Sequence, residues 1–153
     1  MRIFIGIDPG VHTGLCMIVD GKIKLLATID FWKAVDTIKS AKNLATLEHG
    51  TIGLAQALTV VIEDPSQNKP TFDRSVEGMK RQSRISQNVG SNKREATLLI
   101  EFCERNKIKV IASRPSSRSM TKLDAKTFLA ITGWIGKSSG HSRDAAMLVW
   151  GMK

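Results

Sequence analysis

The first ten residues place one carboxylate at the end of a predicted buried strand. Residues 3–7 are apolar and rich in isoleucine, broken only by a glycine, which is typical of a buried strand. Asp8 follows this run directly, and Pro9 and Gly10 then end the strand. We therefore expect Asp8 to lie at the C-terminal tip of the strand, where it could handle a phosphate or a metal ion.

A second apolar run ends in the same way. Residues 58–62 are continuously apolar or β-branched, as expected for a strand buried on both faces, and Glu63, Asp64 and Pro65 follow. A strand, a helix and a further strand in this order predict a right-handed parallel crossover, which places strand tips on one edge of the sheet. If the first and fourth strands are parallel neighbours, Asp8 and Glu63 meet at that edge.

The rest of the chain predicts an antiparallel meander followed by alternating helices and strands. Asp20 and Gly21 are a hairpin signal between the second and third strands. Gly50 and Gly53 should interrupt the first helix. The expected strands cover residues 3–7, 15–19, 23–29, 58–62 and 108–112, and the expected helices cover residues 31–58, 91–106, 123–131 and 142–150. The polar, basic segment before residue 91 also has helical character.

The last predicted helix brings two further candidate ligands. His141 and Asp144 are three residues apart at its start, so both project from one side of the helix. The partial positive charge of a helix N-terminus favours an ionised Asp144. Together with Asp8 and Glu63 they form a set of oxygen and imidazole ligands without a thiolate, which suits Mg²⁺ or Mn²⁺ better than structural zinc.

Length and composition predict one α/β domain over residues 1–153. The chain is 42% hydrophobic, and no linker rich in glycine, serine or proline divides it. It has no apolar run of about 18 residues and no secretory signal, so we expect a cytoplasmic protein without a membrane span. Cys16 and Cys103 lack metal-binding spacing and are expected to be reduced thiols.

The net charge of +9 is confined to the second part of the chain. Residues 1–64 carry 6 Lys and Arg against 7 Asp and Glu, whereas residues 65–153 carry 17 against 7. A basic field on part of a domain suits a polyanion such as nucleic acid. The candidate contacts to nucleic acid are Lys69, Phe72, Arg74, Lys80, Arg81, Arg84, Lys93, Arg94, Lys122 and Lys126.

In three motifs and their order, the chain resembles the RuvC-type Holliday junction resolvases, which have a ribonuclease H-like fold. The resemblance covers nearly the whole chain. It is carried by the strand and turn at residues 6–10 with Thr13 and Gly14, the strand end at residues 61–63, and the helix start at residues 141–145.

The resemblance implies a five-stranded mixed sheet with helices on both faces. It also implies a homodimer that cuts four-way DNA junctions by paired symmetric nicks, leaving 5′ phosphate and 3′ hydroxyl ends. Asp8, Glu63, His141 and Asp144 would be the catalytic residues and would hold two Mg²⁺ or Mn²⁺ ions. Many bacterial members have an aspartate in place of His141, so the metal preference stays open, as does the source, phage or cell.

The resemblance extends to basic and aromatic residues near the site. Family members place active-site lysines where Lys122 and Lys126 stand, and the sequence does not choose between the two. Family members also have junction-distorting aromatics close after the second acid. Here the first aromatic after Glu63 is Phe72, nine residues on, either a stacking wedge or a core residue.

Other function classes stay open to different degrees. An actin-type kinase shares the strand, acid and glycine turn, but it would need a second domain and about twice this length. We therefore expect no nucleotide cofactor. A ribonuclease H-like nuclease acting on other branched DNA or structured RNA, or a junction-binding protein without catalysis, remains an alternative.

Overall fold

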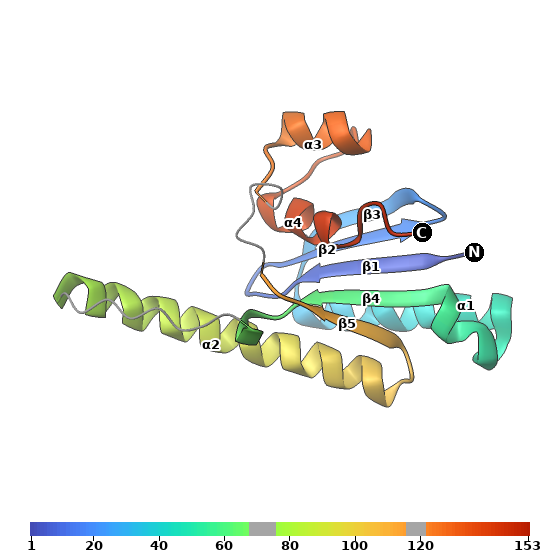
Figure 1. The fold of residues 1–153 in the computed structure, drawn as a ribbon, viewed down its shortest axis with the longest axis horizontal. Helices are drawn as coiled ribbons and strands as arrows, with labels where there is room; N and C mark the ends of the chain where they lie inside the picture. Colours follow the sequence, from blue (N-terminus) through green and yellow to red (C-terminus); the bar gives the residue numbers. More distant parts are fainter. Residues whose placement is uncertain (68–75, 116–121) are drawn as a thin grey trace.

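A five-stranded mixed sheet forms the centre of the structure (Figure 1). The computed structural model describes residues 1–67, 76–115 and 122–153, with the backbone alone for residues 51, 52, 55 and 76–89. The strand order is β3-β2-β1-β4-β5, antiparallel between the first three strands and parallel from β1 to β4 to β5. The strands are β1 (Ile3–Asp8), β2 (Thr13–Val19), β3 (Lys22–Ile29), β4 (Leu58–Glu63) and β5 (Lys109–Ser113).

Helices cover both faces of this sheet. α1 and α2 lie on one face, α4 lies on the other, and α3 stands beyond α4 (Figure 1). The helices are α1 (Phe31–Ala57), η1 (Pro65–Gln67), α2 (Val76–Arg105), α3 (Ala125–Thr132) and α4 (Gly140–Val149). The predicted α/β class, with a mixed sheet between two helical layers, is confirmed.

Alternation along the strands divides the core into two clusters. Successive side chains of a strand point to opposite faces. In β1, Ile3, Ile5 and Ile7 are therefore buried under α1 and α2, whereas Phe4 is buried on the α4 face. Asp8 continues the second series, as Glu63 does after Val61 in β4. Both acids thus belong to the face that α4 covers.

Two helices differ from their predicted extents. α2 begins at Val76 rather than at residue 91. Its first half projects beyond the sheet (Figure 1), so the apolar periodicity of a helix packed on a sheet is not required there. α1 leaves helical geometry at Gly50, whose φ of 67° suits glycine, but the predicted interruption at Gly53 is wrong. No helix in the described part of the chain is long and apolar enough to span a membrane.

Candidate active site

Asp8 and Glu63 come side by side at one edge of the sheet. The parallel register of β1 and β4 pairs Ile7 with Ile62, so the residues that follow are neighbours at the strand ends. Both lie on the α4 face, by the alternation described above. The sequence-based prediction that these two acids meet at a shared edge agrees with this geometry.

α4 carries His141 and Asp144 to the same edge. Its first turn is fixed by a capping box, in which the Ser139 hydroxyl accepts a hydrogen bond from the Ser142 amide and the Ser142 hydroxyl accepts one from the Ser139 amide. His141 Nδ1 lies 3.0 Å from Asp8 Oδ2. The side chain of Asp8 is only 17% exposed, whereas that of His141 is 56% exposed.

Two glycines allow α4 to approach the sheet closely. Gly14 lies opposite Asp8 in the β1–β2 ladder, and a Cβ atom there would collide with the main-chain carbonyl of His141. A Cβ atom at Gly6 would collide with the carbonyl of Ala145. The absence of side chains at these two positions therefore sets the distance between the helix and the acid of β1.

The electrostatics of Glu63 are those of a crowded acidic site. Burial is the largest cause that raises its pKa, which lies at about 7. The charge of Asp8, a hydrogen bond that the protonated form shares with Asp8, and the charge of Asp144 raise the pKa further. Lys122 acts in the opposite direction and lowers it. These interactions place Asp8, Asp144 and Lys122 within electrostatic reach of Glu63.

Asp144 has the same character. Burial, and then the charge of Asp8, raise its pKa to about 6, while the charges of His141, Lys122 and Arg143 lower it. Its Oδ1 atom is buried and has no hydrogen-bond partner. A buried carboxylate oxygen without a partner is costly, so this atom is available to a cation.

The donor set fits a hard divalent cation, although the side chains do not enclose one as they stand. Across residues 1–67, 76–115 and 122–153, no group of three or more His, Cys, Asp or Glu side chains is arranged to hold a metal ion. The fit rests on two other observations. Three carboxylates repel one another in this site, and Asp144 Oδ1 lacks a partner, so a cation would relieve both costs.

The raised pKa values predict how stability depends on pH without metal. Glu63 and Asp144 each bind a proton more tightly in the folded state than in the unfolded state, so their stabilising effect is complete below about pH 4 and is lost as the pH rises through about 6 to 7. In EDTA the melting temperature should therefore fall between about pH 4 and pH 7, and Glu63→Gln should reduce that fall. Thermal unfolding of both proteins tests this. Equal pH dependence in the two proteins would show that Glu63 does not titrate in this range.

The predicted basic contacts differ in how the structure places them. Lys122 acts on both Glu63 and Asp144, whereas Lys126 is exposed in the first turn of α3 and acts on neither. The electrostatics of the two acids thus favour Lys122 of the two predicted lysines. Two of the other candidates lie on α2, Lys93 and Arg94. Three lie in the part of α2 for which only the backbone is described, namely Lys80, Arg81 and Arg84. Three lie outside the described residues, namely Lys69, Phe72 and Arg74.

Three residues besides the predicted ligands help to build the site. Gly14 and Ser139 set the position of α4, as described above. Arg143 donates hydrogen bonds to Leu123 and Ser138 and so ties two loops to the start of α4. Only the spacing of Ser139 and Ser142 carries a sequence signal, that of a capping residue. The contacts of the other two depend on tertiary structure.

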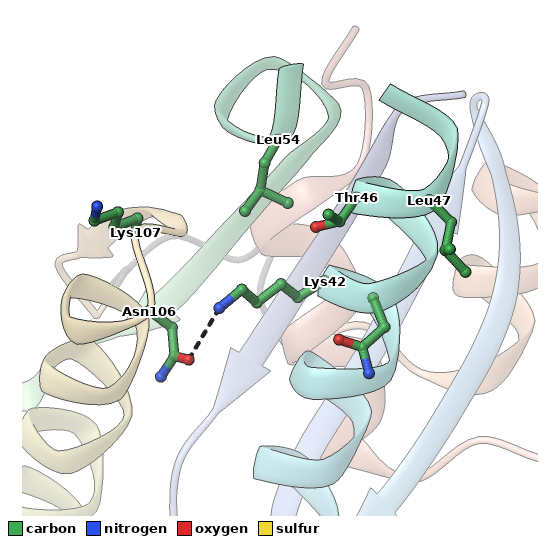
Figure 2. Close-up of a pocket in the computed structure, with 7 residues that line it drawn as sticks. Lys42, Thr46, Leu47, Leu54, Asn106 and Lys107 are labelled. Atoms are coloured by element: carbon green, nitrogen blue, oxygen red, sulfur yellow. Dashed lines mark hydrogen bonds between the residues drawn. The ribbon is translucent and has the colours of Figure 1, made fainter. Parts of the chain in front are cut away.

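A cavity of about 750 Å³ lies away from this site, at the opposite edge of the sheet (Figure 2). It lies between the C-terminal parts of α1 and α2, and Lys42 Nζ donates a 3.1 Å hydrogen bond to Asn106 Oδ1 across it. Lys42 and Lys107 adjoin the C-terminal end of α2, where cations stabilise a helix. These lysines therefore have a structural explanation and add nothing to the acidic site.

Of the comparisons with known proteins, only that with solved structures bears on the fold. No protein-family model matches the sequence, and a search of curated proteins found no match. Among solved structures, RuvC of T. thermophilus in complex with a Holliday junction substrate is 19% identical, with a TM-score of 0.51 over 97% of this chain and 91% of that chain. A second structure of Thermus thermophilus RuvC is 16% identical, with a TM-score of 0.48 over 97% and 92% of the two chains. At these identities the likeness concerns the fold, and the chain has the RuvC-like form of the ribonuclease H-like fold.

Proposed function

We propose that this protein is a metal-dependent endonuclease that resolves four-way DNA junctions by paired symmetric nicks. The observation that carries the proposal is the convergence of Asp8, Glu63, His141 and Asp144 at one edge of a RuvC-like fold. The matching solved structure is a RuvC with a Holliday junction substrate, which supports junction DNA as the substrate class. The net charge of +9 suits a polyanion.

Each residue of the site has a distinct role in this proposal. Asp8, Glu63 and Asp144 would hold two Mg²⁺ or Mn²⁺ ions, which when bound would activate water and stabilise charge on the scissile phosphate. Because His141 Nδ1 contacts Asp8, Nε2 is the nitrogen that would bind a metal ion or exchange a proton. Lys122 places a cation beside the carboxylates, where it can attract the phosphate. The products would carry 5′ phosphate and 3′ hydroxyl ends.

The two-fold symmetry of a junction leads us to propose a homodimer with two sites. Paired cuts within one binding event would convert a supercoiled plasmid with an extruded cruciform mainly to linear product. Excess Asp8→Asn subunits should form heterodimers with one working site and shift the product to nicked circles. If subunits exchange and the ratio of linear to nicked product stays unchanged, the two-site dimer is wrong.

A panel of substrates tests the proposed function. Labelled four-way junction, a linear duplex of the same sequence and a structured RNA would each be incubated with Mg²⁺, with Mn²⁺ and with EDTA. We expect metal-dependent cuts at symmetric positions on opposing strands of the junction and little cutting of the duplex. Faster cutting of RNA would favour the other ribonuclease H-like activity. Tight junction binding without any cutting would favour a binding protein.

A further inference from the structure

The Arg143 side chain joins the start of α4 both to the segment before α3 and to Ser138, which directly precedes the N-cap of α4. From its position on α4, Nε donates a 2.7 Å hydrogen bond to the carbonyl of Leu123. One terminal nitrogen donates to the carbonyl and to the hydroxyl of Ser138, at 3.2 and 3.1 Å. The guanidinium therefore connects α4 to the segment before α3 and to the loop after α3. Lysine could not make this set of bonds, because it lacks the planar fork of donors.

The segment that Arg143 holds includes the active-site cation. Leu123 follows Lys122 directly, and Lys122 is the lysine whose charge lowers the pKa of both Glu63 and Asp144. Lys122 itself is exposed, and Leu123 is only partly buried against the α4 cluster. The bond from Arg143 therefore attaches the main chain next to Lys122 to the helix that carries Asp144.

We propose that Arg143 is a positioning residue, which acts by holding Lys122 beside the carboxylates of the site. This inference rests on the proposed nuclease function for its effect on rate, but not for its effect on structure. Arg143 is next to Asp144 on α4, and its hydrogen bond to the Leu123 carbonyl holds the residue next to Lys122. The charge of Arg143 also acts directly on Asp144, so Arg143→Lys, which keeps that charge, isolates the effect that passes through Lys122.

A double-mutant cycle measures whether the two residues act as one unit. Single-turnover cleavage at saturating junction and Mg²⁺ would be compared for wild type, Arg143→Gln, Arg143→Lys, Lys122→Gln and the double variant that combines Arg143→Lys with Lys122→Gln. Loss of a residue that orients another commonly costs about 10- to 100-fold, and we expect this loss for Arg143→Gln. The double variant should be no slower than Lys122→Gln alone. Junction affinity in EDTA should fall no further in Arg143→Gln than in Lys122→Gln, and Lys137→Gln, an exposed cation in the same loop, is the control.

Arg143→Lys keeps the charge and can replace only part of the hydrogen bonding, so its rate should lie between those of wild type and Arg143→Gln. The cycle with Lys122→Gln uses Arg143→Lys, so it does not depend on whether Arg143→Gln folds. If Arg143→Lys slows the Lys122→Gln protein further, or if Lys122→Gln has no effect, the proposal is wrong.

Amide hydrogen exchange separates this inference from the proposed function. Arg143→Gln should increase exchange at residues 122–128 and 136–139 and leave the sheet unchanged. If wild type cuts no junction, the proposed function fails, and exchange still decides whether Arg143 holds the segment. Unchanged exchange at residues 122–128 would overturn the proposal even for an active enzyme.

Discussion

Asp8→Asn is expected to slow junction cleavage by at least about 100-fold, because bound metal supplies several kcal/mol to such reactions and each 1.4 kcal/mol is about tenfold in rate. Asp8 is the acid that contacts His141 and acts on both Glu63 and Asp144. The substitution removes the carboxylate charge that acts on Glu63 and Asp144, and it leaves the basic surface intact. Junction affinity in EDTA should therefore change by less than about threefold, since phosphate contacts supply most of it.

Asp36→Asn is the matched control for this change. Asp36 is an exposed acid on α1, where it pairs with Lys39, and the substitution makes the same chemical change away from the site. Its cleavage rate should equal that of wild type. An Asp8→Asn protein that cuts within about fivefold of wild type would show that Asp8 is only a turn residue.

Gly14→Ala is expected to damage both the fold and the site. The added Cβ atom would collide with the His141 carbonyl, which is main chain and cannot rotate away. Overpacking of this kind costs about 1–3 kcal/mol, and here α4 must also move away from β2. His141 and Asp144 would move with the helix, so cleavage should fall more than stability alone explains. Urea unfolding and single-turnover cleavage measure the two effects separately.

Gly140→Ala serves as the control on the same helix. Apart from its chain neighbours and the backbone of its own helix, nothing lies within 4 Å of a Cβ atom built at Gly140, and the position is helical. Alanine should therefore leave stability unchanged or raise it by up to about 1 kcal/mol. If Gly14→Ala behaves like Gly140→Ala, close contact between α4 and β2 is not required.

The local pattern of the sequence predicts the sheet and the meeting of its two acids. Asp8 and Glu63 each end an apolar strand, and a parallel crossover brings such strand ends to one edge. The Asp20 and Gly21 hairpin is confirmed as well, since both residues have positive φ, as a tight turn of this type requires. These features depend on a few neighbouring residues and so can be read from the chain.

The remaining parts of the site depend on packing between distant segments. Gly14 has an ordinary place in β2, and only the approach of α4 shows why a side chain there is excluded. The partners of Arg143 are largely main-chain carbonyls, which carry no sequence signal. The choice of Lys122 over Lys126 likewise requires the position of the segment before α3 relative to Glu63 and Asp144.

Diffraction from crystals containing Mn²⁺ would test most directly whether the acids of β1, β4 and α4 form one metal site. Data collected near the manganese absorption edge locate the ion without reference to activity. We expect anomalous density bounded by the carboxylates of Asp8, Glu63 and Asp144, with Asp144 Oδ1 among the ligands, and its loss in Asp8→Asn crystals. Density elsewhere, or none at a Mn²⁺ concentration that supports cleavage, would contradict this account of the site.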